Sequence, residues 1–331
     1  MMKLSLMHRV VDTVDENWQS PLAEQILARW EHDPGTAQYY RASANFIFIF
    51  KNAGKLHFLR FNERTERAKK LLEAELELLH ALDERSLRVS RPVKSLHGRE
   101  VEEVQTEWGT FYAVVFEALS GEHPDAEELR PEQYAAWGKE LGKLHQAMKA
   151  LPEELSAQRP SWRDHLAFVS EMIPPDDQAA REKLGQLLHW ASTLPTTKEN
   201  FGLIHYDFEL DNLRFAGEEI GILDFDDCSR YWYVADLAYA LRDLFEAGGF
   251  DRSHPLFLAF LSGYRSATQI DPNYEQQIQQ FYELHNLVMY AKLLRAVDLS
   301  DSQDHPEWLA NLNKKLVAYR ARCHAKFASN S

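Results

Sequence analysis

The sequence predicts an α+β fold with two lobes, a small β-rich N-terminal lobe and a larger, mostly helical C-terminal lobe. Strand-like passages and tight turns dominate up to residue 119, whereas nearly every later segment has apolar residues at helical spacing. Ser120–Pro124 has the composition of a linker. With 331 residues, both parts can bury a core. We expect residues 1–119 to form the first lobe, with a helical extension over 1–38, and residues 120–331 the second.

Two hairpins and one helix are predicted for the first lobe. Phe46–Phe50 is rich in β-branched and aromatic residues, and the turn-forming residues Asn52–Gly54 follow it directly. The leucines between the two hairpins recur at the spacing of a buried helical face. The predicted elements are strands at Phe46–Phe50 and Leu56–Phe61, a helix at Glu63–Leu82, and strands at Val101–Thr106 and Phe111–Phe116.

The second lobe is predicted to be helical with one β interlude. Pro131 suits the first turn of a helix, because its missing N–H would be unpaired there in any case. The later helices are expected over about 161–173, 176–193, 233–246, 254–267, 273–298 and 306–327, and the interlude over Gly202–Asp207 and Leu213–Asp224.

Composition excludes several classes of protein. The hydrophobic content of 45% is that of a globular chain, and no apolar run reaches the roughly 20 residues of a membrane helix. Met1–Trp18 carries three acids and lacks a signal-peptide core. Cys228 and Cys323 are too few for a disulfide framework or a cysteine-rich zinc site. A net charge of −14 argues against nucleic acid as a partner. We expect a cytoplasmic protein, a monomer or simple homodimer, without a membrane partner.

Polar residues follow two apolar strands in the β interlude. His205, Asp207 and Asn212 form the pattern H-x-D-x4-N, and Asp224 ends the next apolar strand. Phosphoryl transfer needs metal ions on the phosphates and one carboxylate that orients the attacking hydroxyl. Mg²⁺ prefers oxygen ligands and keeps several waters, so one carboxylate and one amide suffice. Asn212 and Asp224 supply that pair, which leaves Asp207 for the acceptor.

These residues and their order resemble the aminoglycoside phosphotransferase and choline kinase group, small-molecule kinases related to protein kinases in fold. The resemblance covers roughly Arg41–Leu244 and is strongest over 203–237. It implies a two-lobed protein-kinase-like fold with a nucleotide-binding N-terminal lobe. It also implies a phosphotransferase that uses ATP or GTP with Mg²⁺ and phosphorylates a hydroxyl of a small molecule. The net negative charge of the chain favours an amine-bearing acceptor.

The resemblance implies roles for individual residues. Asp207 matches the catalytic base, and His205 matches the histidine that supports the loop. Asn212 and Asp224 match the magnesium ligands, and Asp236 matches an aspartate that stabilises the helical lobe. The expected nucleotide contacts are Arg60 against the phosphates, Glu75 paired with Arg60, Ser43 and Asn45 over the phosphates, and Phe116, Glu117 and Leu119 at a hinge for the adenine ring.

Three features depart from the family pattern. Arg60 stands where many kinases have lysine, and a guanidinium fork differs from a point charge. No glycine-rich loop precedes the first strand pair. Tyr206 replaces the glycine that usually follows the motif histidine, which predicts a ring that crowds the acceptor or stacks on it.

Two other functions are compatible with parts of the sequence. Asp224-Phe-Asp226 resembles the D-x-D of haloacid-dehalogenase-type phosphatases, with Asp224 as nucleophile, although Cys228 stands where Thr or Val is usual. A non-catalytic nucleotide-binding regulatory module on a kinase-like fold is the second alternative.

Several further residues are left with two interpretations each. Asp226 and Asp227 are either metal ligands or solvated acids of the loop, and the Arg60–Glu75 pair is either functional or a surface ion pair. The rings of Tyr231–Tyr233 belong either to the core or to a cage for a cationic acceptor. Residues of the later helices are a region in which acceptor contacts are expected: Asp243, Glu283 and His285.

Overall fold

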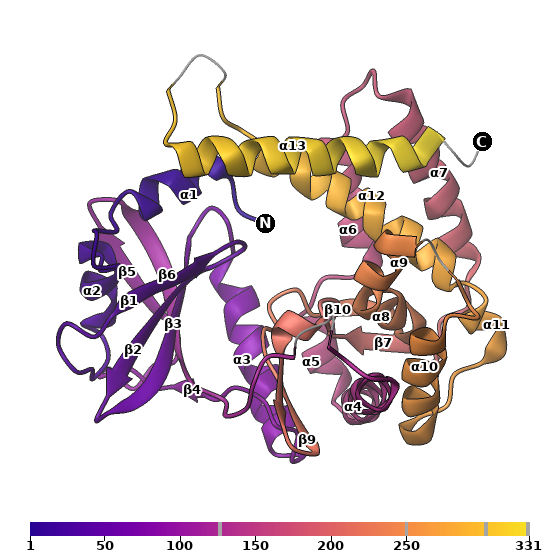
Figure 1. Ribbon diagram of the computed structural model, residues 1–331, viewed down its shortest axis with the longest axis horizontal. Coiled ribbons are helices and arrows are strands. Elements are labelled where there is room, and N and C mark those ends of the chain that lie inside the picture. The colour runs from indigo at the N-terminus through magenta and orange to yellow at the C-terminus, as the bar shows by residue number, and fades with distance from the viewer. Residues whose placement is uncertain (125–127, 249–250, 301–303, 329–331) are drawn as a thin grey trace.

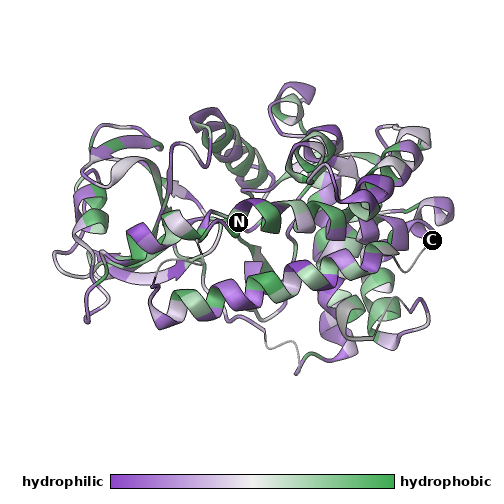
Figure 2. Ribbon diagram, turned by 90° about the horizontal axis from the view of Figure 1, so that it is seen from above, coloured by the Kyte–Doolittle hydropathy of each residue, from purple (hydrophilic) through white to green (hydrophobic). Residues whose placement is uncertain are grey.

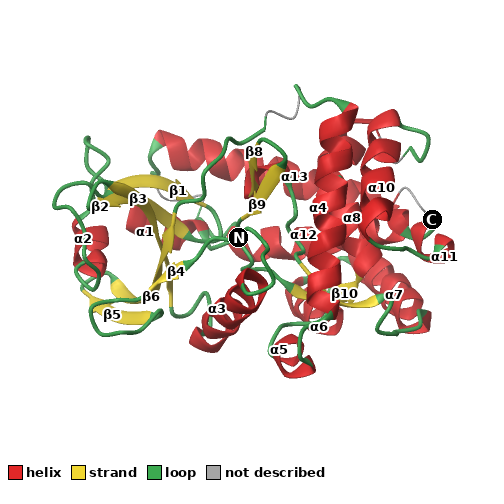
Figure 3. Cartoon of the chain, turned by 90° about the horizontal axis from the view of Figure 1, so that it is seen from below, coloured by secondary structure: helices red, strands yellow, loops and turns green. Residues whose placement is uncertain are grey.

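The computed structural model describes residues 1–124, 128–248, 251–300 and 304–328, and it has the α+β architecture that the sequence predicts. Figure 3 shows the strands of the N-terminal sheet gathered at one end and most of the helices after residue 130 at the other. The sheet is antiparallel in the order β1-β2-β3-β6-β4, and β5 pairs with β6. Its strands are β1 (Gln38–Ala42), β2 (Phe46–Asn52), β3 (Lys55–Glu63), β4 (Pro92–Val93), β5 (Glu102–Thr106) and β6 (Gly109–Glu117).

Alternation along the strands divides this sheet into two faces. Phe46, Phe48 and Phe50 are buried in a core shared with α1 (Leu4–Val11) and α2 (Pro21–Leu27). Successive side chains of a strand point to opposite faces, so the residues that alternate with these phenylalanines point to the opposite face, toward the other lobe. Arg60 of β3 belongs to that opposite face, because it pairs in register with Ile47 and Val114. The sheet therefore presents a guanidinium from its inner face.

The N-terminal prediction needs two corrections. Residues 1–38 are not one helical extension, because only α1 and α2 are helical and Gln38 begins strand β1. The helix expected over Glu63–Leu82 is α3 (Lys69–Asp83), which begins six residues later. Glu63 instead continues β3 and pairs with Phe111, since strand pairing outweighs the local helical preference at this end.

The C-terminal part is helical, and two short antiparallel strand pairs carry its loops. The pairs are β7 (Phe201–Ile204) with β10 (Ser229–Trp232), and β8 (Leu213–Ala216) with β9 (Glu219–Ile222). The sequence did not predict β10 or the split of the expected helix 233–246. The helices are α4 (Pro131–Lys149), α5 (Glu153–Ala157), α6 (Trp162–Met172), α7 (Gln178–Thr193), α8 (Tyr233–Ala240), α9 (Arg242–Gly248), α10 (Pro255–Ala267), α11 (Pro272–Glu275), α12 (Ile278–Ala296) and α13 (Glu307–Ala328).

Glycines allow α4 and α10 to pack at very close range. A Cβ atom on Gly263 would lie 1.8 Å from the main-chain oxygen of Ala135, and one on Gly138 would lie 2.0 Å from that of Phe260. Real atoms do not approach so closely, so any larger residue would force the two helices apart. This contact fixes the helical layer on which α8 and the loop after β7 rest.

The last helix connects the two ends of the molecule. Figure 1 shows α13 running from α1 to α7, and Figure 2 shows hydrophilic and hydrophobic residues alternating along it. Leu309 is buried in the core formed by the sheet, α1 and α2, whereas Cys323 and Phe327 are buried in the helical core. Residues beyond 120 therefore contribute to both cores. Within the described ranges, no helix combines the length and apolarity of a membrane span.

Candidate active site

A pocket lies between the sheet and the loops that follow β7 and β9. Its lining includes Ile47 and Phe58 from the sheet and Leu223 from the end of β9. The predicted residues that line it are Ser43, Asn45, Arg60, Glu75, Phe116, Leu119, Asn212 and Asp224. Residues far apart in the chain thus meet at one cleft, as the two-lobed prediction requires.

Arg60 and Glu75 form a bidentate ion pair at the back of this pocket. The Arg60 Nη1 and Nη2 atoms donate to Glu75 Oε1 and Oε2 at 2.8 and 2.6 Å. The two residues are 5% and 1% exposed, so the interpretation as a surface ion pair is wrong. Burial alone would lower the pKa of Arg60, but Glu75 and other acids hold it above its ordinary value. The guanidinium therefore stays charged, and its centre lies 4.9 Å from the ring centroid of Phe116.

Asp224 lies beside this pair with its carboxyl open to the cleft. Its Oδ1 is 3.4 Å from Arg60 Nη1, and 40% of its side-chain surface is exposed. The remaining surface is enclosed by protein and faces other acids, so burial and the charge of Asp226 raise its pKa to about 7. The backbone at Asp224 is left-handed, with φ 59°. Strained backbone and a perturbed carboxyl are typical of functional positions.

The loop after β7 is fastened by a buried carboxylate from α8. Asp236 Oδ2 accepts a hydrogen bond from the main-chain N–H of His205, and its Oδ1 accepts one from that of Tyr206, both at 2.8 Å. Asp236 Oδ2 also lies 3.0 Å from His145 Nε2. Because Asp236 is fully buried, these bonds replace its hydration and rigidly position the loop.

His205 joins the two loops that carry the predicted chemistry. Its Nε2 lies 3.0 Å from the main-chain oxygen of Leu223, the residue before Asp224. Burial lowers the pKa of this ring, so it is neutral and donates through Nε2–H. Asn212 makes a second connection, because its main-chain oxygen accepts a hydrogen bond from Leu223 N at 2.9 Å. The loop carrying Asp207 and the segment carrying Asp224 are thus held together.

Tyr206 keeps the backbone conformation that a glycine would adopt easily. Its φ is 74°, which costs about 1 kcal/mol for a residue with a Cβ. The ring is buried among aromatic side chains, with its centroid 5.0 Å from that of Tyr239 and 5.5 Å from that of Tyr231. Lys292 Nζ lies 5.3 Å from the Tyr206 centroid. Packing of the ring into the core offsets the backbone strain.

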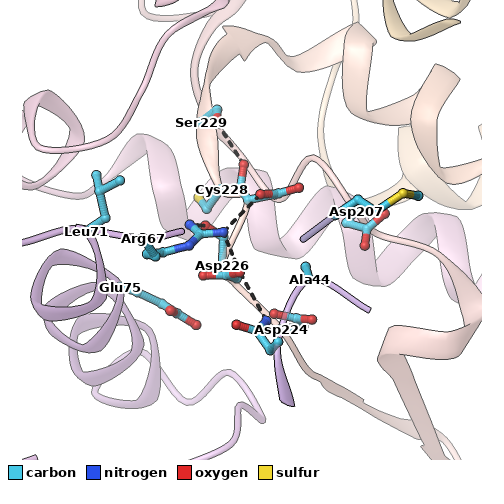
Figure 4. Close-up of polar contacts among 12 residues, drawn as sticks. Ala44, Arg67, Leu71, Glu75, Asp207, Asp224, Asp226, Cys228 and Ser229 are labelled. Carbon is cyan, nitrogen blue, oxygen red and sulfur yellow. Dashed lines mark hydrogen bonds and ion pairs between the residues drawn. The ribbon is translucent and has the colours of Figure 1, made fainter. Parts of the chain in front are cut away.

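Asp226 and Asp227 are engaged by cations and are not solvated acids. Arg67 Nη2 donates to Asp226 Oδ2 at 2.5 Å, and Asn45 Nδ2 donates to the same oxygen at 3.1 Å. Lys292 Nζ donates to Asp227 Oδ2 at 2.7 Å. Figure 4 shows Arg67 against Asp226, with Glu75 and Asp224 nearby. These contacts connect the segment after β9 to α12 and to the chain segments that flank β2 and α3.

Other predicted residues lie at the edge of the site or away from it. Glu117 is the last residue of β6 and lines a different hollow, and its main-chain oxygen accepts a hydrogen bond from Ser90 Oγ at 2.9 Å. The rings of Tyr231–Tyr233 and the thiol of Cys228 are buried in the helical core, and burial raises the pKa of that thiol to about 12. These residues therefore do not form an exposed aromatic cage.

Sequence reasoning missed four cations that organise the site: Arg67, Arg159, Arg242 and Lys292. Arg159 is buried, and its guanidinium donates to the main-chain oxygens of Cys228 at 2.9 Å and Phe225 at 3.2 Å. None of the four lies in a recognisable motif. Only their partners do, so no local signal distinguishes these residues from other arginines and lysines.

A divalent metal ion fits the oxygen groups at this cleft. Asn212 directs its Nδ2 at Asp207, at 2.9 Å from the main-chain oxygen and 3.1 Å from Oδ2, which turns its amide oxygen away from that residue. Asp224 adds a carboxyl exposed to the cleft. One amide oxygen and one carboxylate, completed by phosphate oxygens and waters, match the preference of Mg²⁺.

Comparison with known proteins identifies the family of this chain. Residues 41–276 match the family described as "Phosphotransferase enzyme family". The amicoumacin kinase of Bacillus subtilis (strain 168) is 23% identical over 307 residues, which cover 88% of this chain and 91% of that protein. An amicoumacin kinase solved with AMP-PNP, Ca²⁺ and Ami superposes with a TM-score of 0.77, at 21% identity, over 97% of this chain and 96% of its own.

Two further structures share the fold at lower similarity. A microcompartment-associated aminopropanol kinase has a TM-score of 0.69 at 22% identity and covers 93% of this chain and 96% of its own. Spectinomycin phosphotransferase, solved with ADP and spectinomycin, has a TM-score of 0.60 at 15% identity and covers 91% of this chain and 98% of its own. The phosphatase alternative needs a parallel α/β sheet after Asp224, but the described residues after Asp224 form helices and one strand, β10, which is antiparallel to β7. The fold therefore contradicts that alternative. The chain belongs to the phosphotransferase enzyme family and has its two-lobed, protein-kinase-like fold.

Proposed function

We propose that this protein transfers the γ-phosphoryl group of Mg²⁺-ATP, or of Mg²⁺-GTP, to a hydroxyl of a small, amine-bearing molecule. The observation that supports the proposal is the meeting of Asn212 and Asp224 with the buried Arg60–Glu75 pair at one cleft. Asp207 is outside the lining of this cleft and is connected to it by the hydrogen bond from Asn212. Each group supplies something that phosphoryl transfer needs, and the order of the groups along the chain is that of the family.

The N-terminal lobe is proposed to hold the nucleotide. Arg60, kept charged and oriented by Glu75, faces the place of the phosphates, and Phe116 and Leu119 border the space for the base. A Mg²⁺ ion held by Asn212 and Asp224 would neutralise charge on the phosphates. Because Arg67 and Asn45 occupy the Asp226 carboxylate, that acid is assigned to positioning the segment after β9 and not to the metal.

Asp207 is proposed to act as the base. The acceptor hydroxyl oxygen forms a bond to the γ-phosphorus while the bond from that phosphorus to the bridging oxygen breaks, and the hydroxyl proton passes to the Asp207 carboxylate. The side chain is 33% exposed, which leaves it accessible to an acceptor. Its carboxylate is oriented by Asn212, so the base and the metal site share one residue.

An amine on the acceptor is supported by the net charge of the chain, which is −14. A cationic molecule is attracted to a protein with an excess of acids, because charge of one sign raises the local concentration of the opposite sign. The named relatives that act on amicoumacin and aminopropanol are consistent with this class.

The test is nucleotide consumption by the purified protein. ATP and GTP are each incubated with Mg²⁺ and with 1-amino-2-propanol, choline, homoserine, kanamycin, spectinomycin or glucose, and ADP or GDP release is measured. We expect release that depends on an amino alcohol or aminoglycoside and disappears in Asp207→Asn. Nucleotide binding without turnover on any acceptor would instead favour a regulatory module, and an active Asp207→Asn variant would refute the base assignment.

A further inference from the structure

Arg242, the first residue of α9, contacts two carboxylates of the loop that carries the proposed base. Its Nη1 lies 2.9 Å from Asp207 Oδ1, and its Nη2 forms an ion pair with Glu209. The Arg242 side chain is 13% exposed. Nη1 also lies 3.4 Å from the main-chain oxygen of Tyr239, one turn earlier in the chain. A single guanidinium thus connects α9 to both acidic side chains.

The two oxygens of Asp207 have different partners. Oδ1 faces Arg242, while Oδ2 accepts a hydrogen bond from Asn212 Nδ2 at 3.1 Å. Two donors on opposite oxygens fix the rotation of a carboxylate, and charge-assisted bonds from arginine are strong and directional. The carboxylate of Asp207 therefore has one defined orientation before any acceptor arrives.

A purely structural role for Arg242 explains its contacts less well, because the loop backbone already has another anchor. Asp236 already fastens the backbone of this loop through the N–H groups of His205 and Tyr206. Arg242 contacts side-chain oxygens of the loop and adds no hydrogen bond to its backbone. Burial and the charge of Asp207 raise the pKa of Glu209 to about 7, whereas Arg242 lowers it, so the guanidinium keeps two mutually repelling acids side by side.

We propose that Arg242 is a positioning residue for phosphoryl transfer, which holds the Asp207 carboxylate in the orientation that meets the acceptor hydroxyl, and that Glu209 fastens the guanidinium. This inference rests on the proposed role of Asp207 as base. Arg242 acts through Asp207 and takes no proton itself. Glu209 is the second anchor that prevents the guanidinium from rotating away.

The test compares Arg242→Ala and Arg242→Lys with the control Arg265→Ala. Arg265 pairs with Glu275 away from the loop, and its side chain is 49% exposed, compared with 13% for Arg242. Activity is measured with the acceptor that gives the highest rate in the panel above, or with water if hydrolysis is the faster reaction. The midpoint of thermal unfolding and the affinity for MgATP are measured for each variant.

We expect kcat to fall about 100-fold in Arg242→Ala with nucleotide affinity unchanged, because small misplacements of a reacting group cost rates of this size. Arg242→Lys should retain intermediate activity, and Glu209→Gln should lose less than Arg242→Ala. Guanidinium ion at a non-denaturing concentration should restore part of the activity of Arg242→Ala, whereas NaCl at the same concentration should not. A role in stability alone would not give this rescue.

Three outcomes would overturn the inference. Wild-type kcat in Arg242→Ala would show that Asp207 needs no such partner. A raised kcat or a lowered KM for the acceptor would show that Arg242 competes with the acceptor. Equal losses in Arg242→Ala and Arg265→Ala, without rescue, would show a structural effect. If Asp207→Asn itself remains active, the assignment of Asp207 as base fails first, so this failure is distinguishable from a failure of the inference about Arg242.

Discussion

Asn212 donates its side-chain amide to Asp207 twice, at 2.9 Å to the main-chain oxygen and at 3.1 Å to Oδ2 of the carboxylate. Asn212 thus orients the proposed base with its nitrogen, and its oxygen points away from Asp207 and is the proposed ligand of the metal. The base and the metal site are coupled through one side chain. Variants at this position should therefore affect two steps together.

For Asn212→Ala, we expect a loss of both kcat and magnesium-dependent nucleotide affinity, because one substitution removes the donor to Asp207 and the metal-facing oxygen. Asp207→Ala should lower kcat by orders of magnitude and leave nucleotide affinity nearly intact. Titration calorimetry with and without Mg²⁺, beside steady-state kinetics, separates the two effects. Asn273→Ala, at an exposed position in α11, is the control and should change neither quantity. An Asn212→Ala variant with wild-type affinity for Mg²⁺-nucleotide would remove Asn212 from the metal site.

The affinity for Mg²⁺-ATP should depend on pH through Asp224. Its pKa is raised to about 7, so the carboxyl is neutral below this pH and must lose a proton before it binds a metal. Affinity should therefore rise with pH up to about 7 and then level off, with a limiting slope of about tenfold per pH unit on the acid side.

The control for this prediction is Asp224→Asn. ATP itself titrates near neutral pH, so the informative quantity is the difference between the two proteins across the same pH range. We expect the variant to bind more weakly and to lack the extra pH dependence. Parallel curves for the two proteins would contradict the assignment of Asp224 as the titrating ligand.

Removal of Glu75 should destabilise the protein strongly. The Arg60–Glu75 pair is buried, and loss of one partner leaves an uncompensated charge, which costs about 3–5 kcal/mol. Glu75→Ala should therefore lower the free energy of unfolding in a urea titration by an amount of this order. The matched control is Glu73→Ala on the same helix. Glu73 pairs with Lys69 at the surface, and such pairs contribute about 0.5 kcal/mol or less. Similar losses of unfolding free energy in the two variants would mean that burial of the Arg60–Glu75 pair does not raise the cost of removing one partner.

Substitution of a glycine by alanine should have opposite effects on stability in a packed helix contact and on an open helix face. Gly263→Ala would place a Cβ 1.8 Å from the Ala135 main-chain oxygen, and overpacking of this kind costs about 1–3 kcal/mol or more. Gly185→Ala, within α7, meets no atom within 4 Å and should stabilise the helix by about 0.5–1 kcal/mol. Thermal unfolding distinguishes them. A neutral Gly263→Ala variant would show that the helices separate easily at this point.

The predictions from sequence succeeded where the signal is local. The hairpin of β2 and β3 follows from apolar residues around the turn-forming residues Asn52–Gly54, and α4 follows from Pro131 and a periodic apolar stripe. Predictions failed where distant pairing decides the conformation. Ser229–Trp232 becomes strand β10 because it pairs with β7, which lies more than 20 residues earlier. Glu63 remains in a strand because it pairs with β6.

The candidate site divides in the same way. The pattern formed by His205, Asp207 and Asn212 is local, so the chemistry that it indicates can be predicted without a structure. The partners that orient these residues are not local. Arg67 meets Asp226 across 159 positions of sequence, and Lys292 meets Asp227 across 65. Many arginines and lysines could satisfy each acid equally well in an unfolded chain.

The sequence by itself determined the family, the α+β architecture and the identity of the groups that carry the proposed chemistry, because these depend on residue type, order and short-range periodicity. Only the tertiary structure decided which cation orients which acid, how Tyr206 fits a left-handed backbone, and how α13 contributes to both cores. The physical reason is that an ion pair depends on distance in space and on burial, and packing fixes both only once the two lobes have come together.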